Sequence, residues 1–191
     1  MWGSGARFRV DGRPVIRGLV RIAVLGLLGG WLADRILRHR AGGAPPEPFR
    51  SLIVIDAPIE RVWAVVADIP GQPRWMREMR SVRLLDPGPV GVGTRGEATV
   101  RILGMQVTDP VTVTAFEPPT RFAIRHEGTF EGGGEITLEP GADGSTTIVR
   151  WEETLISPIF PHAWRLASEP IVGSIFQADL GHLRDLVEAN D

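Results

Sequence analysis

Six consecutive segments of the chain alternate apolar and polar residues with a period of two, and this run most constrains the fold. Each segment is bounded by Pro, Gly or Asp residues that are typical of turns. The connections between them are short, so neighbouring strands should pair antiparallel as a meander. The predicted strands are 81–86, 96–103, 107–118, 120–127, 133–140 and 145–155.

Residues on both sides of this run complete the predicted domain. Residues 49–56 alternate as a further strand, and Pro58 suits the first turn of a short helix that ends at 68–71. After Pro161, apolar residues recur every three to four positions as far as Val187, which predicts a long C-terminal helix. We therefore predict an α+β domain in which a curved antiparallel sheet of about seven strands wraps around that helix. Such curling leaves a space between the sheet and the helices.

Four features of residues 50–188 occur in a characteristic order. They are IxIxAPxxxVWxxVxDxxxxPxW at 53–75, GVGTR at 91–95, VTxxxPPxRF at 113–122, and the closing helix. As an ordered set they resemble the SRPBCC superfamily, the START/Bet v 1-like helix-grip group that includes the polyketide cyclase/dehydrase and lipid transport branch. The resemblance implies a helix-grip fold with a deep, mostly apolar cavity. It implies no single chemistry, because members range from lipid carriers to aromatase/cyclases and hydrolase-like branches.

Strand parity indicates which side chains face such a cavity. The outward positions carry mixed charges suited to cross-strand pairs on a solvated face, namely Arg101, Arg125, Glu127, Glu135, Arg150 and Glu152. For the aromatic and methionine side chains outside the strands, plain core packing is the alternative to lining the cavity. The predicted lining comprises Trp75, Met76, Met79, Val100, Phe122, Ile124, His126, Ile136, Trp151, Trp164 and Ile175.

His126 and Glu153 are the polar exceptions on the predicted inner face. A histidine and a carboxylate in a cavity commonly form an acid/base site, so these two residues are the candidate catalytic groups. The alternative is that each lies near a strand end and reaches water. The intervening Gly132–Gly134 either makes a bulge or leaves room in the pocket.

Composition and motifs exclude several function classes. The chain has no cysteine, lysine or tyrosine, which rules out disulfides, a Schiff-base lysine and a P-loop lysine. The GxGxxG match at 91–96 leads into a strand, so it predicts a hairpin turn and no nucleotide site. Asp179 and His182 are predicted as a solvated pair on the polar side of the last helix. We expect no cofactor and no metal.

The first 50 residues differ from the remainder in charge. They hold nine arginines against three acids, a net charge of +6, whereas residues 51–191 hold twelve arginines against twenty acids, a net charge of −8. An acidic body is a poor partner for nucleic acid. We therefore predict a basic arm at 1–40, a Pro/Gly linker at 41–48 and the folded domain at 49–191.

The arm contains an apolar helix at about 15–38. Its longest uncharged run, 22–33, is shorter than the roughly 20 residues that span a bilayer. Snorkelling of Arg21 and Arg35 could lengthen the apolar stretch enough to span a bilayer. A helix that lies in the membrane interface is the other form of membrane association. A soluble helix packed on the domain and a signal peptide are the remaining alternatives. We expect a membrane-associated protein with its domain in the cytoplasm, the alternative being a soluble cytoplasmic protein.

The sequence favours a non-catalytic protein that binds a hydrophobic small molecule or lipid, with transport or sequestration as the roles that such binding allows. The observation behind this is an inner face almost free of titratable groups beside a membrane-seeking arm. The alternative is a polyketide cyclase/dehydratase-like enzyme that uses His126 and Glu153. An interaction module whose cavity is filled by its own side chains is the third reading, and the oligomeric state is open.

Overall fold

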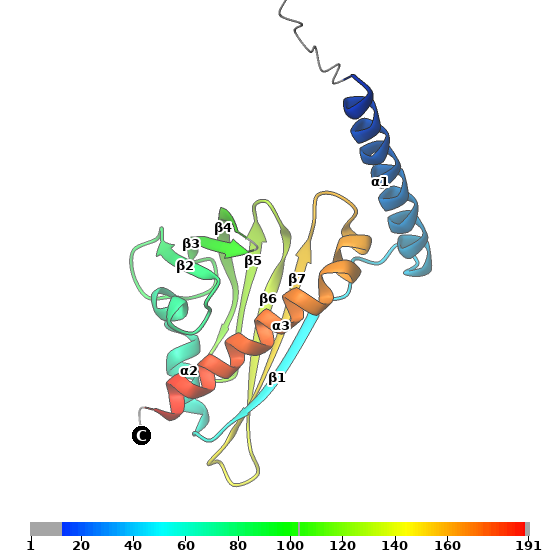
Figure 1. Ribbon diagram of the computed structural model, residues 1–191. Helices are drawn as coiled ribbons and strands as arrows, with labels where there is room; N and C mark the ends of the chain where they lie inside the picture. The colour runs from blue at the N-terminus through cyan, green and yellow to red at the C-terminus, as the bar shows by residue number, and fades with distance from the viewer. Residues whose placement is uncertain (1–12, 103, 190–191) are drawn as a thin grey trace, which may run out of the picture.

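A seven-stranded antiparallel sheet forms the body of the protein, one long helix crosses its concave face, and a second long helix stands outside it (Figure 1). The computed structural model describes residues 13–102 and 104–189. In chain order the elements are α1 (Arg13–Arg40), β1 (Phe49–Ile55), α2 (Ile59–Val66), the 3₁₀ helix η1 (Ile69–Arg74), β2 (Met79–Leu84), β3 (Arg95–Ile102), β4 (Met105–Glu117), β5 (Arg121–Glu127), β6 (Glu131–Pro140), β7 (Thr147–Ile156) and α3 (Pro161–Glu188).

The strands are ordered β1-β7-β6-β5-β4-β3-β2, so each strand from β2 onward pairs with the next along the chain. β1 closes the sheet by pairing antiparallel with β7. The ladder shifts register between Met79 and Ser81 and between Val113 and Ala115, and such irregularities increase the local bend of a sheet. α3 packs mainly against β1, while η1 packs against β2 at the other edge. This is the predicted helix-grip fold, which is confirmed.

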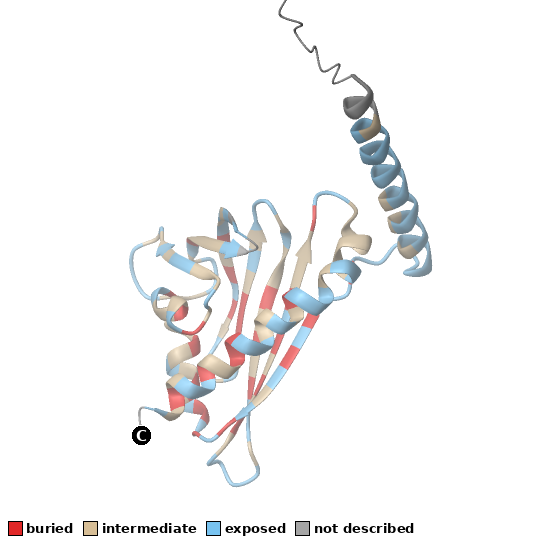
Figure 2. Ribbon diagram, viewed as in Figure 1, coloured by how far each residue is buried: buried red, intermediate tan, exposed pale blue. Residues whose placement is uncertain are grey.

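The core lies between the concave face and α3, as strand alternation requires. Val149 and Trp151 on β7 point inward and are buried with Leu180 and Leu183 of α3. Figure 2 shows this buried side of the strands and of α3, with α1 almost wholly exposed. The outer face carries cross-strand ion pairs, which confirms the predicted solvated surface. They join Arg50 to Glu152, Arg83 to Glu97, Arg121 to Glu135, and Arg150 to Glu139.

α1 extends two residues beyond the predicted helix at each end. It ends where Gly42 and Gly43 adopt positive φ angles of 62° and 80°, and the Gly43 N–H donates to the Arg38 carbonyl at 3.1 Å. Most of the large apolar side chains from residue 19 onward project into solvent, among them Leu19, Ile22, Leu25, Leu28, Trp31 and Leu32. Among the residues described, no helix combines the length and apolarity needed to cross a bilayer. The spanning form of the predicted arm is therefore not supported.

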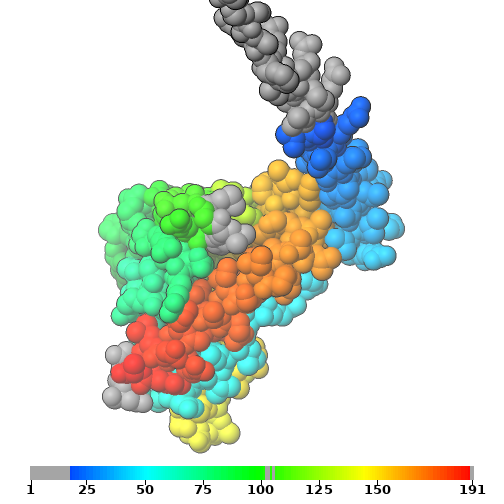
Figure 3. Space-filling model, in the orientation of Figure 1, coloured from blue at the N-terminus to red at the C-terminus, as the bar shows by residue number. Residues whose placement is uncertain are grey.

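The second half of α1 is docked on the N-terminus of α3 (Figure 3). Phe160, which precedes α3, has a left-handed φ of 51° and offers no side-chain cap. Asp34 of α1 supplies the cap, because its Oδ1 accepts the backbone N–H groups of His162 (2.8 Å) and Ala163 (3.2 Å). Close by, a Cβ on Gly30 would lie 2.8 Å from the Phe160 ring. A helix terminus left uncapped by its own sequence is thus satisfied by another helix.

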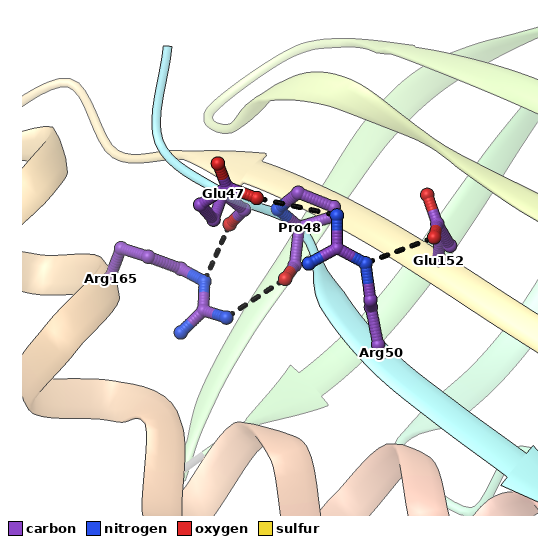
Figure 4. Close-up of polar contacts among 5 residues, drawn as sticks. All are labelled: Glu47, Pro48, Arg50, Glu152 and Arg165. Carbon is purple, nitrogen blue, oxygen red and sulfur yellow. Dashed lines mark hydrogen bonds and ion pairs between the residues drawn. The ribbon is translucent and has the colours of Figure 1, made fainter. Parts of the chain in front are cut away.

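Arg165 of α3 holds the chain between α1 and β1 (Figure 4). Its Nε donates to the Glu47 carbonyl at 2.7 Å and its Nη2 to the Pro48 carbonyl at 2.9 Å. The guanidinium also lies 3.8 Å from the centre of the Phe49 ring, within cation–π range. The entry into β1 is therefore anchored to the same end of α3 that Asp34 caps.

We predict that Asp34→Ala lowers the free energy of unfolding by about 1 kcal/mol, because two helix N–H groups lose their acceptor. Denaturant unfolding measures the change, and hydrogen exchange should quicken in the first turn of α3. Asp34→Asn should recover most of the loss, since asparagine also caps helices. Asp185→Ala, which removes an exposed acid from the other end of α3, is the matched control. An Asp34→Ala protein as stable as the wild type would contradict the capping role.

Candidate ligand-binding cavity

A cavity of about 430 Å³ lies between the concave face of the sheet, the η1–β2 segment and α3. Small-molecule sites generally fall between roughly 300 and 1,000 Å³ and are lined mostly by apolar groups. Here β2 to β7 supply alternate side chains, and α3 supplies a stripe from Trp164 to Asp179. The space exceeds the lower bound for a ligand site, so the reading in which the protein fills its own cavity is not favoured.

The structure brings together ten of the eleven predicted lining residues. The exception is Trp75, which is fully buried in the core and packs edge-on against Trp151 at 5.9 Å between ring centres. Trp75 is therefore a core residue, which was the alternative to lining the cavity. The ten on the wall are Met76, Met79, Val100, Phe122, Ile124, His126, Ile136, Trp151, Trp164 and Ile175.

Several polar wall residues were missed from the sequence. Asp109 lies on the same face of β4 as Val111 and Val113, so strand parity would have found it. Gln72 and Glu78 belong to the irregular segment around η1, where no period could place them. The prediction of a solvated Asp179 is wrong, because only 4% of this residue is exposed and it lines the cavity. The helix surface around it is covered by the segment that contains Arg77.

His126 and Glu153 meet on the cavity wall. They lie on β5 and β7, the strands on either side of β6, and His126 Nε2 is 2.6 Å from Glu153 Oε1. The other carboxylate oxygen accepts the indole N–H of Trp151 at 2.9 Å. Glu153 is 5% exposed, so both of its oxygens are satisfied inside the fold. The alternative, in which each residue lies near a strand end and reaches water on its own, is wrong, because the two side chains contact each other inside the fold.

Gly134 on β6 makes space for the Glu153 carboxylate. A Cβ at this position would lie 2.3 Å from Glu153 Oε2. The β6 ladders to β5 and β7 run through 131–134 without a register shift, so the predicted bulge is not formed. The glycine therefore leaves room in the pocket, which was the other reading.

Charge on the wall shifts the pKa of His126. Burial of the imidazole opposes protonation, but the hydrogen bond and charge of Glu153, together with the charge of Asp109, outweigh it, and the pKa of His126 is raised above its usual value. Asp109 is itself held by the Thr129 backbone N–H (2.9 Å) and hydroxyl (3.1 Å). The arrangement favours an imidazolium paired with a carboxylate, which can exchange one proton with a bound molecule.

Asp179 forms a second polar position on α3. Its Oδ1 accepts the backbone N–H of Arg77 at 3.1 Å, and His182 Nδ1 lies 3.6 Å away, just beyond hydrogen-bonding distance. Burial, with a smaller contribution from the charge of Glu78, raises the pKa of Asp179 above its usual range. Within the part of the chain described, no three metal-ligating side chains gather at one point.

A helix-grip fold with this cavity defines the class of the protein, and sequence comparison identifies the family. Residues 49–188 match the family described as "Polyketide cyclase / dehydrase and lipid transport". The chain belongs to this family, as the resemblance implied. A comparison with curated proteins gives no significant match.

Solved structures share the fold at low sequence identity. The protein TTHA0849 from Thermus thermophilus is 22% identical, with a TM-score of 0.61 over 75% of this chain and 99% of that one. The Zhui aromatase/cyclase from Streptomyces sp. R1128 is 19% identical, with a TM-score of 0.60 over 74% and 93% of the two chains. A START superfamily protein from Mycobacterium smegmatis is 15% identical, with a TM-score of 0.60 over 76% and 99%. At these identities the likeness concerns the fold alone.

We predict that Glu153→Gln lowers the pKa of His126, because burial then acts on the imidazole without the opposing carboxylate. An NMR titration of the His126 ring measures this directly. Since the raised pKa stabilises the fold at pH below the unfolded value of about 6.5, that stabilisation fades as pH rises through the folded pKa. The difference in free energy of unfolding between the wild type and Glu153→Gln should therefore shrink as pH rises from about 6.5 through the folded pKa of His126. An unchanged His126 titration in Glu153→Gln would refute the coupling.

Proposed function

We propose that the protein binds a hydrophobic small molecule or lipid in its internal cavity. The observation that carries the proposal is the apolar space of about 430 Å³ enclosed by the sheet and α3. Transfer of apolar ligand surface from water contributes roughly 25 cal/mol per Å², and a largely preformed wall reduces the entropy lost on binding. Family membership supports the same reading.

Binding is tested with the whole protein and an apolar fluorescent probe, 1-N-phenylnaphthylamine. We expect Ala98→Phe to weaken probe binding at least about tenfold, because Ala98 lines the cavity and the larger ring fills it. Thr99→Phe places the same ring on the neighbouring outward position of β3, where Thr99 contacts Thr108, and should leave binding unchanged. Native mass spectrometry of the purified protein would identify any ligand that it carries. A wild-type protein that ignores the probe would overturn the proposal.

A second candidate function is a cyclase/dehydratase-like reaction on a bound polyketide or related carbonyl compound. It is supported by the 2.6 Å contact between His126 and Glu153, the two groups that such chemistry requires as acid and base. The imidazolium would give a proton to a carbonyl oxygen, and the resulting base would take one from carbon. Glu153→Gln and His126→Asn should then abolish product formation while probe binding persists. Equal turnover in wild type and both variants would exclude this role.

We further propose that α1 associates with a membrane by lying in the interface. The support is a helix on which the large apolar side chains from Leu19 to Ile36 are 45–69% exposed, within an arm of net charge +6. The domain would then face the cytoplasm, where anionic lipids attract arginine-rich segments.

Co-sedimentation with vesicles that contain phosphatidylserine tests the role of α1. We expect the full chain to bind, with weaker binding at high salt, and Leu28→Glu to lose at least about tenfold in affinity. Leu28 is 57% exposed on α1, and Leu52→Glu, at a 49% exposed position on the sheet, is the matched control. Equal binding by both variants would overturn the proposal, as would a wild-type protein that stays in the supernatant.

A further inference from the structure

The charged residues on the cavity wall are almost all acidic. Four carboxylates line it, together with one histidine, and none of the arginines in the described residues does so. This distribution is selective, because the chain contains 21 basic residues in all and the outer sheet face is rich in arginine. The acidic wall residues are Glu78, Asp109, Glu153 and Asp179.

The one histidine does not neutralise this wall. His126 is 2.6 Å from Glu153, so an imidazolium there is matched by that carboxylate. Asp109 is held by two donors of Thr129, which are hydrogen bonds and bring no positive charge. Within the described part of the chain, the remaining wall carboxylates therefore have no arginine beside them on the wall.

Asp179 and Glu78 line the cavity from α3 and from the segment that precedes β2. Asp179 is 4% exposed, and its Oδ1 accepts the backbone N–H of Arg77. His182 Nδ1 is 3.6 Å from Oδ1, a contact that is an ion pair only when the imidazole is protonated. Glu78 directly follows Arg77, whose backbone N–H Asp179 accepts, and both carboxylates line the same cavity. A cation in the cavity beside them would be attracted to both, and most strongly to Asp179, which water reaches least.

We propose that the cavity selects apolar ligands that carry a basic nitrogen and rejects apolar acids of the same size. An ammonium group would lie against Glu78 and Asp179, with its hydrocarbon part along the apolar wall formed by β2 to β7. A fatty acid or an anionic lipid would bring a further negative charge into the cavity and meet no arginine among the described wall residues. The inference rests on the proposed function, because it names the ligand class for that same cavity.

A head-group series with a constant chain tests this selection. Dodecylamine, dodecanol and dodecanoic acid compete with 1-N-phenylnaphthylamine for the full-length protein at about pH 7, where the amine is cationic and the acid anionic. We expect dodecylamine to bind about tenfold or more tightly than dodecanoic acid, with dodecanol between them. Equal binding of amine and acid, or tighter binding of the acid, would overturn the inference. Failure of all three ligands and of the probe would instead overturn the proposed function.

Two variants locate the selection on the wall. Asp179→Asn keeps an oxygen that can accept the Arg77 N–H, and Glu78→Gln keeps the side-chain length. Each should reduce the preference for the amine over the acid several-fold while dodecanol binds as before. Glu139→Gln removes the same charge from the outer face and should leave the preference unchanged. An undiminished preference in Glu78→Gln and Asp179→Asn would refute the assignment, and if one variant fails to fold, the other and the wild-type series still decide.

Discussion

The width of the sheet relative to one helix determines much of this structure. Seven strands spaced about 4.8 Å apart span roughly 29 Å, whereas a helix with its side chains is about 10–12 Å across. α3 packs mainly on β1, and η1 packs on β2 at the opposite edge. The central strands are left with their apolar side chains facing the space between these two elements. The cavity is thus a consequence of how the two covering elements are distributed over a curved sheet.

A cavity of this kind can hold polar groups only where the fold satisfies them, because unpaired polar groups in an apolar site are costly. Glu153 meets this condition through His126 and the Trp151 indole, and Gly134 provides the clearance that the carboxylate needs. Asp179 is satisfied in part by a backbone N–H from the opposing η1–β2 segment. The contact at Asp179 also ties the two covering elements together across the cavity.

Local periodicity predicted the fold well because both sheet and helix repeat at distinct intervals. Parity placed Phe122, Ile124 and His126 on one wall, since a strand alternates strictly. Parity could not be applied to Trp75, because this residue lies outside the strands and follows the irregular η1, where Pro73 interrupts any period. For Asp179 the helical pattern assumed a single buried side, whereas α3 is covered both by the sheet and by the segment at Arg77. The cap that Asp34 provides joins residues 128 positions apart, and no local pattern carries that information.

Basic and acidic residues are distributed unevenly over the protein. Arginine is concentrated on the N-terminal arm and on the outer sheet face, while the cavity wall holds carboxylates. An arginine inside would need to be desolvated and paired, as Arg165 is at the edge of the fold by two carbonyls and the Phe49 ring. Among the wall residues described, His126 is the only one that can carry a positive charge, and it is paired with Glu153. Under the two proposals, the basic arm would meet an anionic membrane surface and the acidic cavity would hold a cationic apolar molecule.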